Sequence, residues 1–282
     1  MSTSFKPPVL ISRYMLDQGK DFLSLALQRR KEYELLIDSG AFTAFQKNFS
    51  YTVQDYISWI SKTKLAPDKY IQLDVIGDEQ ATVKNLDITL QAGQNPIPVF
   101  TRGSKLSTLE YMYKQAPMVA VGGLVGSRNR NGYVKWVMNH IKSRPVHLLG
   151  FAPLPFLARY KPTSCDTSGW GQTHRYGQMR LYSGGGKWSV LSKQDFLAKP
   201  SKKVQNQIAL YGGDIYQLSK MDGWRFKNRV PSTSTVIAAR GWARYVTDLK
   251  SRYGVTLYSV AGVPHDLEIL LDAFKWNEEQ TW

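Results

Sequence analysis

Cysteine is almost absent from this chain, since Cys165 is the single cysteine among 282 residues. One cysteine excludes a disulfide within the chain and any zinc site built from several cysteines. Apolar runs are short, and none approaches the roughly 20 residues that a membrane-spanning helix needs. The first residues also lack an apolar signal core followed by a small-residue cleavage site. We therefore expect a cytoplasmic protein that has no contact with a membrane.

Acidic residues are few compared with basic ones: 22 Asp and Glu stand against 37 Lys and Arg, which gives a formal net charge of +15. Basic side chains that contact phosphates release counterions, so this excess favours a polyanionic partner such as nucleic acid. The 8 Trp and 16 Tyr residues could add base stacking. A basic protein without such a partner is the alternative. The hydrophobic fraction of 43% excludes a disordered chain, because it can support a packed core.

Short apolar runs rich in β-branched residues recur through the first half of the chain, and helical patterns separate most of them. The predicted strands cover 8–11, 33–37, 70–76, 97–101, 118–121 and 146–151. The predicted helices cover 20–30, 53–62, 79–91, 106–115 and 132–142. This alternation predicts βαβ units and an α/β fold with a parallel sheet.

Polar residues or glycines follow several of these strands, as at 38–40, 74, 101–103, 122–123 and 150. Barrel enzymes place their sites at the carboxyl ends of the strands, so we favour a (β/α)8 TIM-like barrel over an open doubly wound sheet. We expect residues 1–199 to form a catalytic barrel domain. Residues 200–282 would form a basic, α-rich C-terminal segment that completes the barrel or binds nucleic acid. Within these domains we expect a hairpin over 179–191 and helices over 236–253 and 266–276.

Two aspartates stand at predicted strand ends. Aspartate is rare in strands, so a carboxylate at such a position calls for a structural or functional explanation. Asp38 opens the sequence Asp-Ser-Gly-Ala-Phe at 38–42, which would place it beside bare backbone at the mouth of a site. Capping of the next helix by Asp38 or Ser39 is the alternative. Asp74 is flanked by apolar residues and could accept hydrogen bonds from the amino groups of a guanine-like edge. A buried ion pair would also explain Asp74.

Two further segments contain candidate site residues. The run Gly-Gly-Leu at 122–124 would let a ligand approach the backbone, although a tight βα turn is the favoured explanation of this run alone. Asp166 lies among small hydroxyl residues that could orient its carboxylate. The neighbouring Cys165 could be a thiol nucleophile paired with His147 or His174, but a small buried cysteine is the more common case.

In this order, these segments resemble the tRNA-guanine transglycosylase superfamily, whose members are (β/α) barrels that exchange guanine for a 7-deazaguanine. The family motifs match 38–42, Gly-Gly-Leu at 122–124, His-Leu-Leu-Gly at 147–150 and the later aspartate at 166, and the resemblance covers roughly residues 33–195. It implies that Asp166 is the nucleophile on the sugar carbon C1′ and that Asp38 is the general acid/base. The implied base-binding residues are Asp74, Ser39, Phe42, Leu149, Gly122, Gly123 and Leu124, with Phe42 and Leu149 on either side of the base.

The chain departs from the family in two places. It cannot hold the Cys-rich zinc site of the tRNA enzymes, so we expect no metal and no other cofactor. Arg102 stands where the family has a glutamine, and it could favour a base with an acceptor group such as a nitrile; contact with a phosphate or a surface position is the alternative.

A short, zinc-free relative is similar to the phage-type transglycosylases, which insert bases such as 7-cyano-7-deazaguanine into DNA. If the chain is encoded by a phage, it would act in the cytoplasm of the host. We expect DNA and the free base as partners, with base exchange on tRNA or a catalytically inactive nucleic-acid-binding barrel as alternatives. The expected backbone-binding residues are Arg175, Arg180, Lys187, Arg225, Lys227 and Arg229. Trp170, Trp188 or Trp224 could support a flipped nucleotide, or could pack in the core.

Overall fold

The computed structural model describes residues 5–49, 51–171, 173, 176–197, 200–225, 227 and 230–280. The chain divides into two compact units. Unit 1 contains residues 1–167 and 255–262, and unit 2 contains residues 168–254 and 263–282. This division differs from the expected boundary at 199/200, because the segment after residue 167 already belongs to unit 2 and one late strand returns to unit 1.

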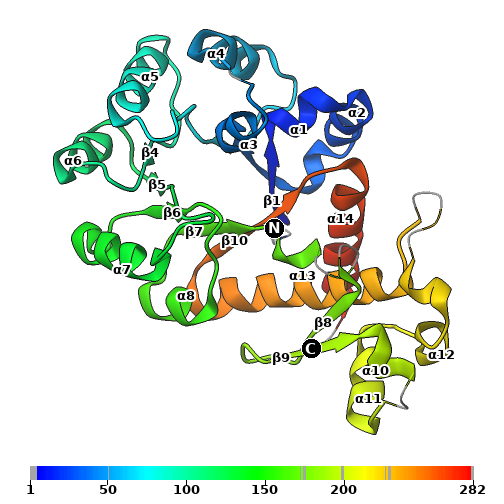
Figure 1. Ribbon diagram of the computed structural model, residues 1–282. Helices are drawn as coiled ribbons and strands as arrows, with labels where there is room; N and C mark the ends of the chain where they lie inside the picture. Colours follow the sequence, from blue (N-terminus) through cyan, green and yellow to red (C-terminus); the bar gives the residue numbers. More distant parts are fainter. Residues whose placement is uncertain are drawn as a thin grey trace. The chain divides into compact units, whose positions relative to one another are not determined.

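Unit 1 is built on an eight-stranded sheet with the strand order β3-β2-β1-β10-β7-β6-β5-β4, and every pairing in it is parallel. Its strands are β1 (Pro8–Ser12), β2 (Glu34–Asp38), β3 (Lys69–Tyr70), β4 (Val99–Phe100), β5 (Val119–Val121), β6 (Val146–Leu148), β7 (Ser164–Thr167) and β10 (Thr256–Ala261). Figure 1 shows β1 (blue) and β10 (orange) side by side. The late strand β10 therefore lies inside the sheet, between β1 and β7.

Helices connect the strands, and Figure 1 shows them arranged around the sheet. They are α1 (Arg13–Gln18), α2 (Lys20–Gln28), α3 (Ala41–Gln46), α4 (Val53–Lys62), α5 (Glu79–Gln91), α6 (Leu106–Gln115), α7 (Arg130–Ile141) and α8 (Leu154–Tyr160), with a 3-10 turn η1 (Arg30–Glu32). The start of α4 shows the local cause: Thr52 and Asp55 form a capping box, and the buried face of the helix follows the apolar spacing of its sequence. The predicted α/β fold with a parallel sheet is confirmed.

The sheet is curled, but its ladder does not close, which corrects the expectation of a continuous eight-stranded barrel. The edge strands β3 and β4 have two residues each, and a single parallel bridge between Ile71 and Ile97 links them. The expected strand 70–76 leaves the ladder because the Gln72 side chain takes over the pairing. Its amide donates to the Thr82 carbonyl at 3.0 Å and its oxygen accepts from the Val99 N–H at 3.1 Å.

Unit 2 is mainly helical and contains one antiparallel hairpin, β8 (Gln178–Tyr182) with β9 (Trp188–Ser192). Its helical elements are η2 (Gly169–Gly171), α10 (Lys193–Leu197), α11 (Lys202–Leu210), α12 (Ile215–Leu218), η3 (Met221–Trp224), α13 (Thr233–Tyr253) and α14 (Pro264–Glu278). The predicted hairpin and the last two helices are confirmed. A core that includes Met179, Leu181, Tyr211 and Ile237 holds the hairpin and helices together. Within the described ranges, no helix combines the length and the apolar character needed to span a bilayer.

Candidate active site

Alternate residues of the strands in unit 1 face a common apolar cluster. This cluster includes Leu10 on β1, Leu36 on β2 and Tyr258 on β10. Because side chains alternate along a strand, Asp38 follows Leu36 on the same face, at the carboxyl end of β2. The carboxyl ends of parallel strands lie at one edge of the sheet, so this edge is where a site would form.

The Asp38 carboxylate shapes the turn that leads into α3. Its Oδ2 accepts the Gly40 N–H at 2.9 Å, and the buried Ser39 hydroxyl accepts the Ala41 N–H at 3.3 Å. Gly40 has a φ of 81°, and a Cβ at this position would lie 2.8 Å from the Cβ of Tyr14. Only glycine combines this conformation with this packing. Both side chains thus support the turn before α3, whereas the helix N-cap is Gly40, without a side-chain cap hydrogen bond. The Asp38 carboxylate stays at the strand end.

Asp166 lies on β7, where two donors hold one of its oxygens. Its Oδ1 accepts the Gly150 N–H at 2.9 Å and lies 3.2 Å from the Nε2 of His147. The other ring nitrogen of His147 lies 2.8 Å from the hydroxyl of Ser164. His147 is fully buried and its ring meets Tyr258 edge-on at 6.0 Å, which places it on the inner face of β6. Two neighbouring strands therefore orient this carboxylate.

Asp38, Asp166 and Asp74 interact through their charges. Burial raises the pKa of Asp38 to about 6; the charge of Asp166 adds to this increase, while the Gly40 N–H and His147 oppose it. Burial also raises the pKa of Asp74 to about 7, and the charge of Asp38 adds to that increase. Three aspartates that are distant in the sequence therefore share one electrostatic environment, with Asp38 coupled to both of the others.

A cavity of about 230 Å³ opens beside Asp74. Phe45, Phe49 and Tyr51 contribute aromatic walls, and the loop after β3 contributes Leu73, Val75 and Ile76. Asn85 also lines the cavity, and its amide donates to the Leu73 carbonyl at 3.1 Å. A carboxyl group beside aromatic and aliphatic walls suits a flat, polar-edged ligand. Asp38, Asp166 and Phe42 are not among the residues that line this cavity.

Two of the expected base-binding residues lie on the inner side of the sheet. A Cβ at the buried Gly122 would lie 3.0 Å from Val99 and 3.7 Å from Leu149, so the missing side chain leaves room beside Leu149. Leu149 packs against the inner cluster that contains Leu36 and Tyr258. Leu124 is also buried.

Three other expected base-binding residues lie at or near the surface. Phe42 is 41% exposed on α3, and Gly123 is exposed. The exposed Arg102 donates to the Ser127 hydroxyl at 3.2 Å and to the Arg128 carbonyl at 2.6 Å. Its guanidinium is therefore engaged with the loop after β5, and among the described residues no bond from Arg102 to the three aspartates is found.

Cys165 does not resemble a nucleophile. It is fully buried, and burial raises the pKa of its thiol well above the usual value. It neighbours Asp166 on the strand and so faces the other side of the sheet. His147 bonds to Ser164 and Asp166, and the other suggested partner, His174, lies outside the described residues.

The expected backbone-binding residues belong to unit 2. Lys187 is exposed beside the turn of the hairpin, and Arg180 lies 5.9 Å from the ring centre of Trp188. Arg225 and Lys227 are exposed, and Lys227 pairs with Asp222 at 3.0 Å. Arg175 and Arg229 lie outside the described residues.

The three tryptophans considered as supports for a flipped nucleotide differ in exposure. Trp170 is buried, and Trp188 and Trp224 are partly buried. The indole N–H of Trp224 donates to the Leu218 carbonyl at 2.7 Å, which anchors this ring in unit 2. Packing is therefore the observed role of Trp170 and Trp224.

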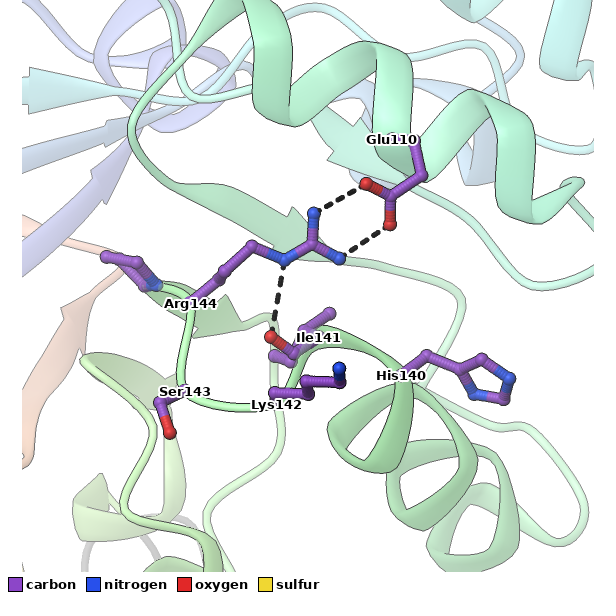
Figure 2. Close-up of a pocket in the computed structure, with 7 residues that line it drawn as sticks. Glu110, His140, Ile141, Lys142, Ser143 and Arg144 are labelled. Atoms are coloured by element: carbon purple, nitrogen blue, oxygen red, sulfur yellow. Dashed lines mark hydrogen bonds and ion pairs between the residues drawn. The ribbon is translucent and has the colours of Figure 1, made fainter.

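A larger cavity, of about 660 Å³, lies at the end of α7 where the chain approaches β6. Figure 2 shows the Arg144 guanidinium facing Glu110 through two parallel bonds, at 2.7 and 2.6 Å. The Arg144 guanidinium that lines this cavity is thus already paired with Glu110. The cavity also lies before the start of β6, whereas the aspartates lie toward the carboxyl ends of the strands. Across the described part of the chain, no cluster of three or more His, Cys, Asp or Glu side chains could hold a metal ion.

Sequence reasoning missed the surroundings of Asp166. His147 was considered only as a partner of Cys165, and Ser164 and Gly150 had no assigned role toward Asp166. One signal was available: the alternation along β6 puts His147 on the same face as Leu149, an expected base-binding residue. Comparison with known proteins adds no relative, because neither a family model nor a curated protein matches this chain.

Proposed function

We propose that this chain is a transglycosylase that exchanges guanine in DNA for a free 7-deazaguanine base, such as 7-cyano-7-deazaguanine. The observation that carries the proposal is the placement of Asp38 on β2 and Asp166 on β7 in one curled sheet, close enough for the charge of Asp166 to affect Asp38. Base exchange at a sugar carbon needs two carboxylates, because one must capture the carbon while the other moves a proton. The ordered motifs around these two residues support the same chemistry.

In the first step, an oxygen of Asp166 attacks C1′ of the nucleotide, and the bond from C1′ to the base nitrogen breaks. The electron pair of that bond leaves with guanine, which takes a proton from Asp38. In the second step, Asp38 removes a proton from the incoming base, whose nitrogen attacks C1′ and releases Asp166 as a carboxylate. A pKa of about 6 suits Asp38 for both proton transfers, since both of its forms are populated near neutral pH.

Asp74 is the proposed acceptor for the amino edge of the base. Its cavity has the aromatic and aliphatic walls that a planar heterocycle requires. The basic residues of unit 2, including Lys187, would contact the phosphates of the DNA strand, which must release the target base from its stack. The net charge of +15 supports a polyanionic substrate.

The test is incorporation of labelled 7-cyano-7-deazaguanine into guanine-containing DNA or tRNA, with nucleosides from the digested product measured by mass spectrometry. We expect labelled DNA with the wild-type protein and none with Asp166→Ala, while DNA binding persists in both. Cys165→Ala is the matched control on the neighbouring position and should keep its activity.

Each other outcome has a distinct meaning. Labelled tRNA without labelled DNA would assign the same chemistry to tRNA. Abasic sites that form without added base would indicate a hydrolytic glycosylase. Nucleic-acid binding without any turnover would identify a catalytically inactive binding protein.

A further inference from the structure

We propose that His147 is a positioning residue that, in its neutral Nε2–H form, fixes the Asp166 carboxylate through Oδ1 and so leaves Oδ2 as the oxygen that attacks C1′. This inference rests on the proposed function for its catalytic consequence. Its structural part concerns His147, Ser164, Gly150 and Asp166 and can be tested without turnover.

The hydrogen-bond partners determine the tautomer of His147. A carboxylate only accepts hydrogen bonds, so the Nε2 atom that faces Asp166 at 3.2 Å must carry a hydrogen. In a neutral ring, Nδ1 is then the acceptor, and the Ser164 hydroxyl donates to it over 2.8 Å. The Asp166 carboxylate thus sets the tautomer, and the Ser164 hydroxyl supports it by donating to Nδ1.

The two bonds to Asp166 end on the same atom. Gly150 N–H and His147 Nε2–H both approach Oδ1, at 2.9 and 3.2 Å. Within the described ranges, no hydrogen bond ends on Oδ2. Asp166 is 7% exposed, so the carboxylate is held while a small part of it stays accessible. The geometry therefore divides the carboxylate into an anchored oxygen and a reactive oxygen.

This division serves both steps of base exchange. When Oδ2 bonds to C1′, Oδ1 becomes the carbonyl oxygen of a glycosyl ester and keeps its two donors. When the incoming base displaces the ester, the electron pair of the C1′–Oδ2 bond returns to Asp166. The two N–H groups then face a full carboxylate, and hydrogen bonds to a charged acceptor are the stronger ones. The donors thus stabilise the group that leaves in the second step.

Few charged groups surround this arrangement. Asp38 faces it from β2, and its pKa responds to both Asp166 and His147. Tyr258 packs against the His147 ring from β10, and its hydroxyl donates to Glu34 at 2.5 Å. Lys69 pairs with the same Glu34 at 2.6 Å. Cys165, on the other face of β7, is held neutral by burial. Asp38 is thus the acidic group that faces His147 and Asp166 from another strand.

The first experiment measures the ring nitrogens of His147 by long-range ¹H–¹⁵N NMR of the full chain labelled in histidine. The chain has four histidines, and the signals lost in His147→Gln identify residue 147. We expect an unprotonated Nδ1 and a protonated Nε2 at pH 7. An Nδ1–H tautomer, a rapid exchange of tautomers or a doubly protonated ring would overturn the proposal, whether or not the protein exchanges bases.

The second experiment measures kcat for base exchange and the Kd for DNA in His147→Phe and His147→Gln. Loss of a hydrogen bond to a charged group costs about 10- to 100-fold in rate, so we expect His147→Phe to lower kcat by that factor and leave the Kd for DNA unchanged. His147→Gln can still donate and should recover most of the rate. A wild-type kcat in folded His147→Phe, or no recovery in His147→Gln, would overturn the proposal.

A third variant covers the case in which His147→Phe does not fold. Ser164→Ala removes one hydroxyl and leaves the imidazole in place. We expect a smaller loss of kcat than in His147→Phe, with the Kd for DNA unchanged. A wild-type kcat in Ser164→Ala would contradict the support that the Ser164 hydroxyl gives to the His147 ring. Absence of turnover in the wild-type protein would count against the proposed function instead.

Discussion

Asp38 and Asp166 lie on β2 and β7, 128 positions apart in the sequence; burial raises the pKa of Asp38, and the charge of Asp166 adds to that increase. Strands β1 and β10 stand between them in the sheet, so the coupling acts across the curl of the sheet rather than along one strand. Asp166 has fixed donors on one oxygen, while Asp38 accepts a single N–H from its own turn. These different surroundings suit one residue for bonding to carbon and the other for proton transfer.

The first prediction concerns Asp38 and pH. In the proposed mechanism, the departure of guanine requires the protonated form of Asp38, so the single-turnover rate of guanine release should fall as pH rises through about 6. Asp38→Asn should slow release by about 100-fold or more and remove this pH dependence. Rapid-quench assays with radiolabelled guanine in DNA measure both effects. A pH dependence near 6 that persists in Asp38→Asn would assign the titration to another group.

The second prediction concerns Asp74 and stability. The folded-state pKa of Asp74, about 7, lies above its ordinary value of 3.8, so the folded protein holds a proton that the unfolded chain has lost. The free energy of unfolding should therefore fall as pH rises from about 4 to 7. Asp74→Asn removes this pH-dependent contribution. The difference in free energy of unfolding between the variant and the wild-type protein should therefore be more favourable to the variant at pH 7.5 than at pH 4, by on the order of 2 kcal/mol. Urea unfolding of both proteins at both pH values measures the difference, and an equal effect at both would refute the burial argument.

The amphipathic helices were the most predictable part of the fold. The predicted range 53–62 matches α4, and 79–91 and 106–115 match α5 and α6. Their buried faces repeat at helical spacing and their ends are set locally, as by the caps at Thr52 and Asp78. Such helices need no information from distant parts of the chain.

The edges of the sheet and the late strand were less predictable, because pairing with distant segments decides them. The apolar run 70–76 shares only Tyr70 with the two-residue strand β3, since the Gln72 side chain replaces the ladder after the bridge at Ile71. Strand β10 lies between two long helices in the sequence and was missed. In the site, Asp38 and Asp74 were visible as carboxylates at predicted strand ends. Asp166 was visible only through its hydroxyl neighbours and the family resemblance, because strand β7 was missed as well. The role of His147 depends on its register opposite Ser164, which a single strand does not reveal.

The third prediction compares two glycines of similar conformation. Gly40 and Gly77 have φ values of 81° and 82°, but a Cβ would meet Tyr14 at 2.8 Å in the first case and nothing within 4 Å in the second. Both alanine variants carry the cost of the left-handed conformation, about 1 kcal/mol or more. Gly40→Ala should lose further stability through the clash and should also slow base exchange, because its turn holds Asp38. Equal unfolding temperatures in the two variants would contradict the expected clash between a Cβ at position 40 and Tyr14.

The fourth prediction concerns the phosphate contacts that we propose for unit 2. Lys187→Ala should weaken DNA binding to a similar extent on every sequence and lower the slope of log Kd against log salt by about 1. Lys114→Ala, which removes an exposed lysine from α6, is the matched control and should leave the slope unchanged. Fluorescence anisotropy from 50 to 300 mM salt provides the comparison. Equal slopes for the two variants would show that Lys187 does not contact the DNA phosphates.

The most direct measurement is the detection of a covalent bond between the protein and its substrate. Guanine-containing DNA should form a denaturation-resistant adduct with the wild-type chain, and peptide mass spectrometry should locate the sugar on Asp166. Asp166→Ala should form none, while Asp38→Asn binds DNA and forms the adduct slowly. A bond located on another residue, or base exchange by Asp166→Ala at the wild-type rate, would contradict the account.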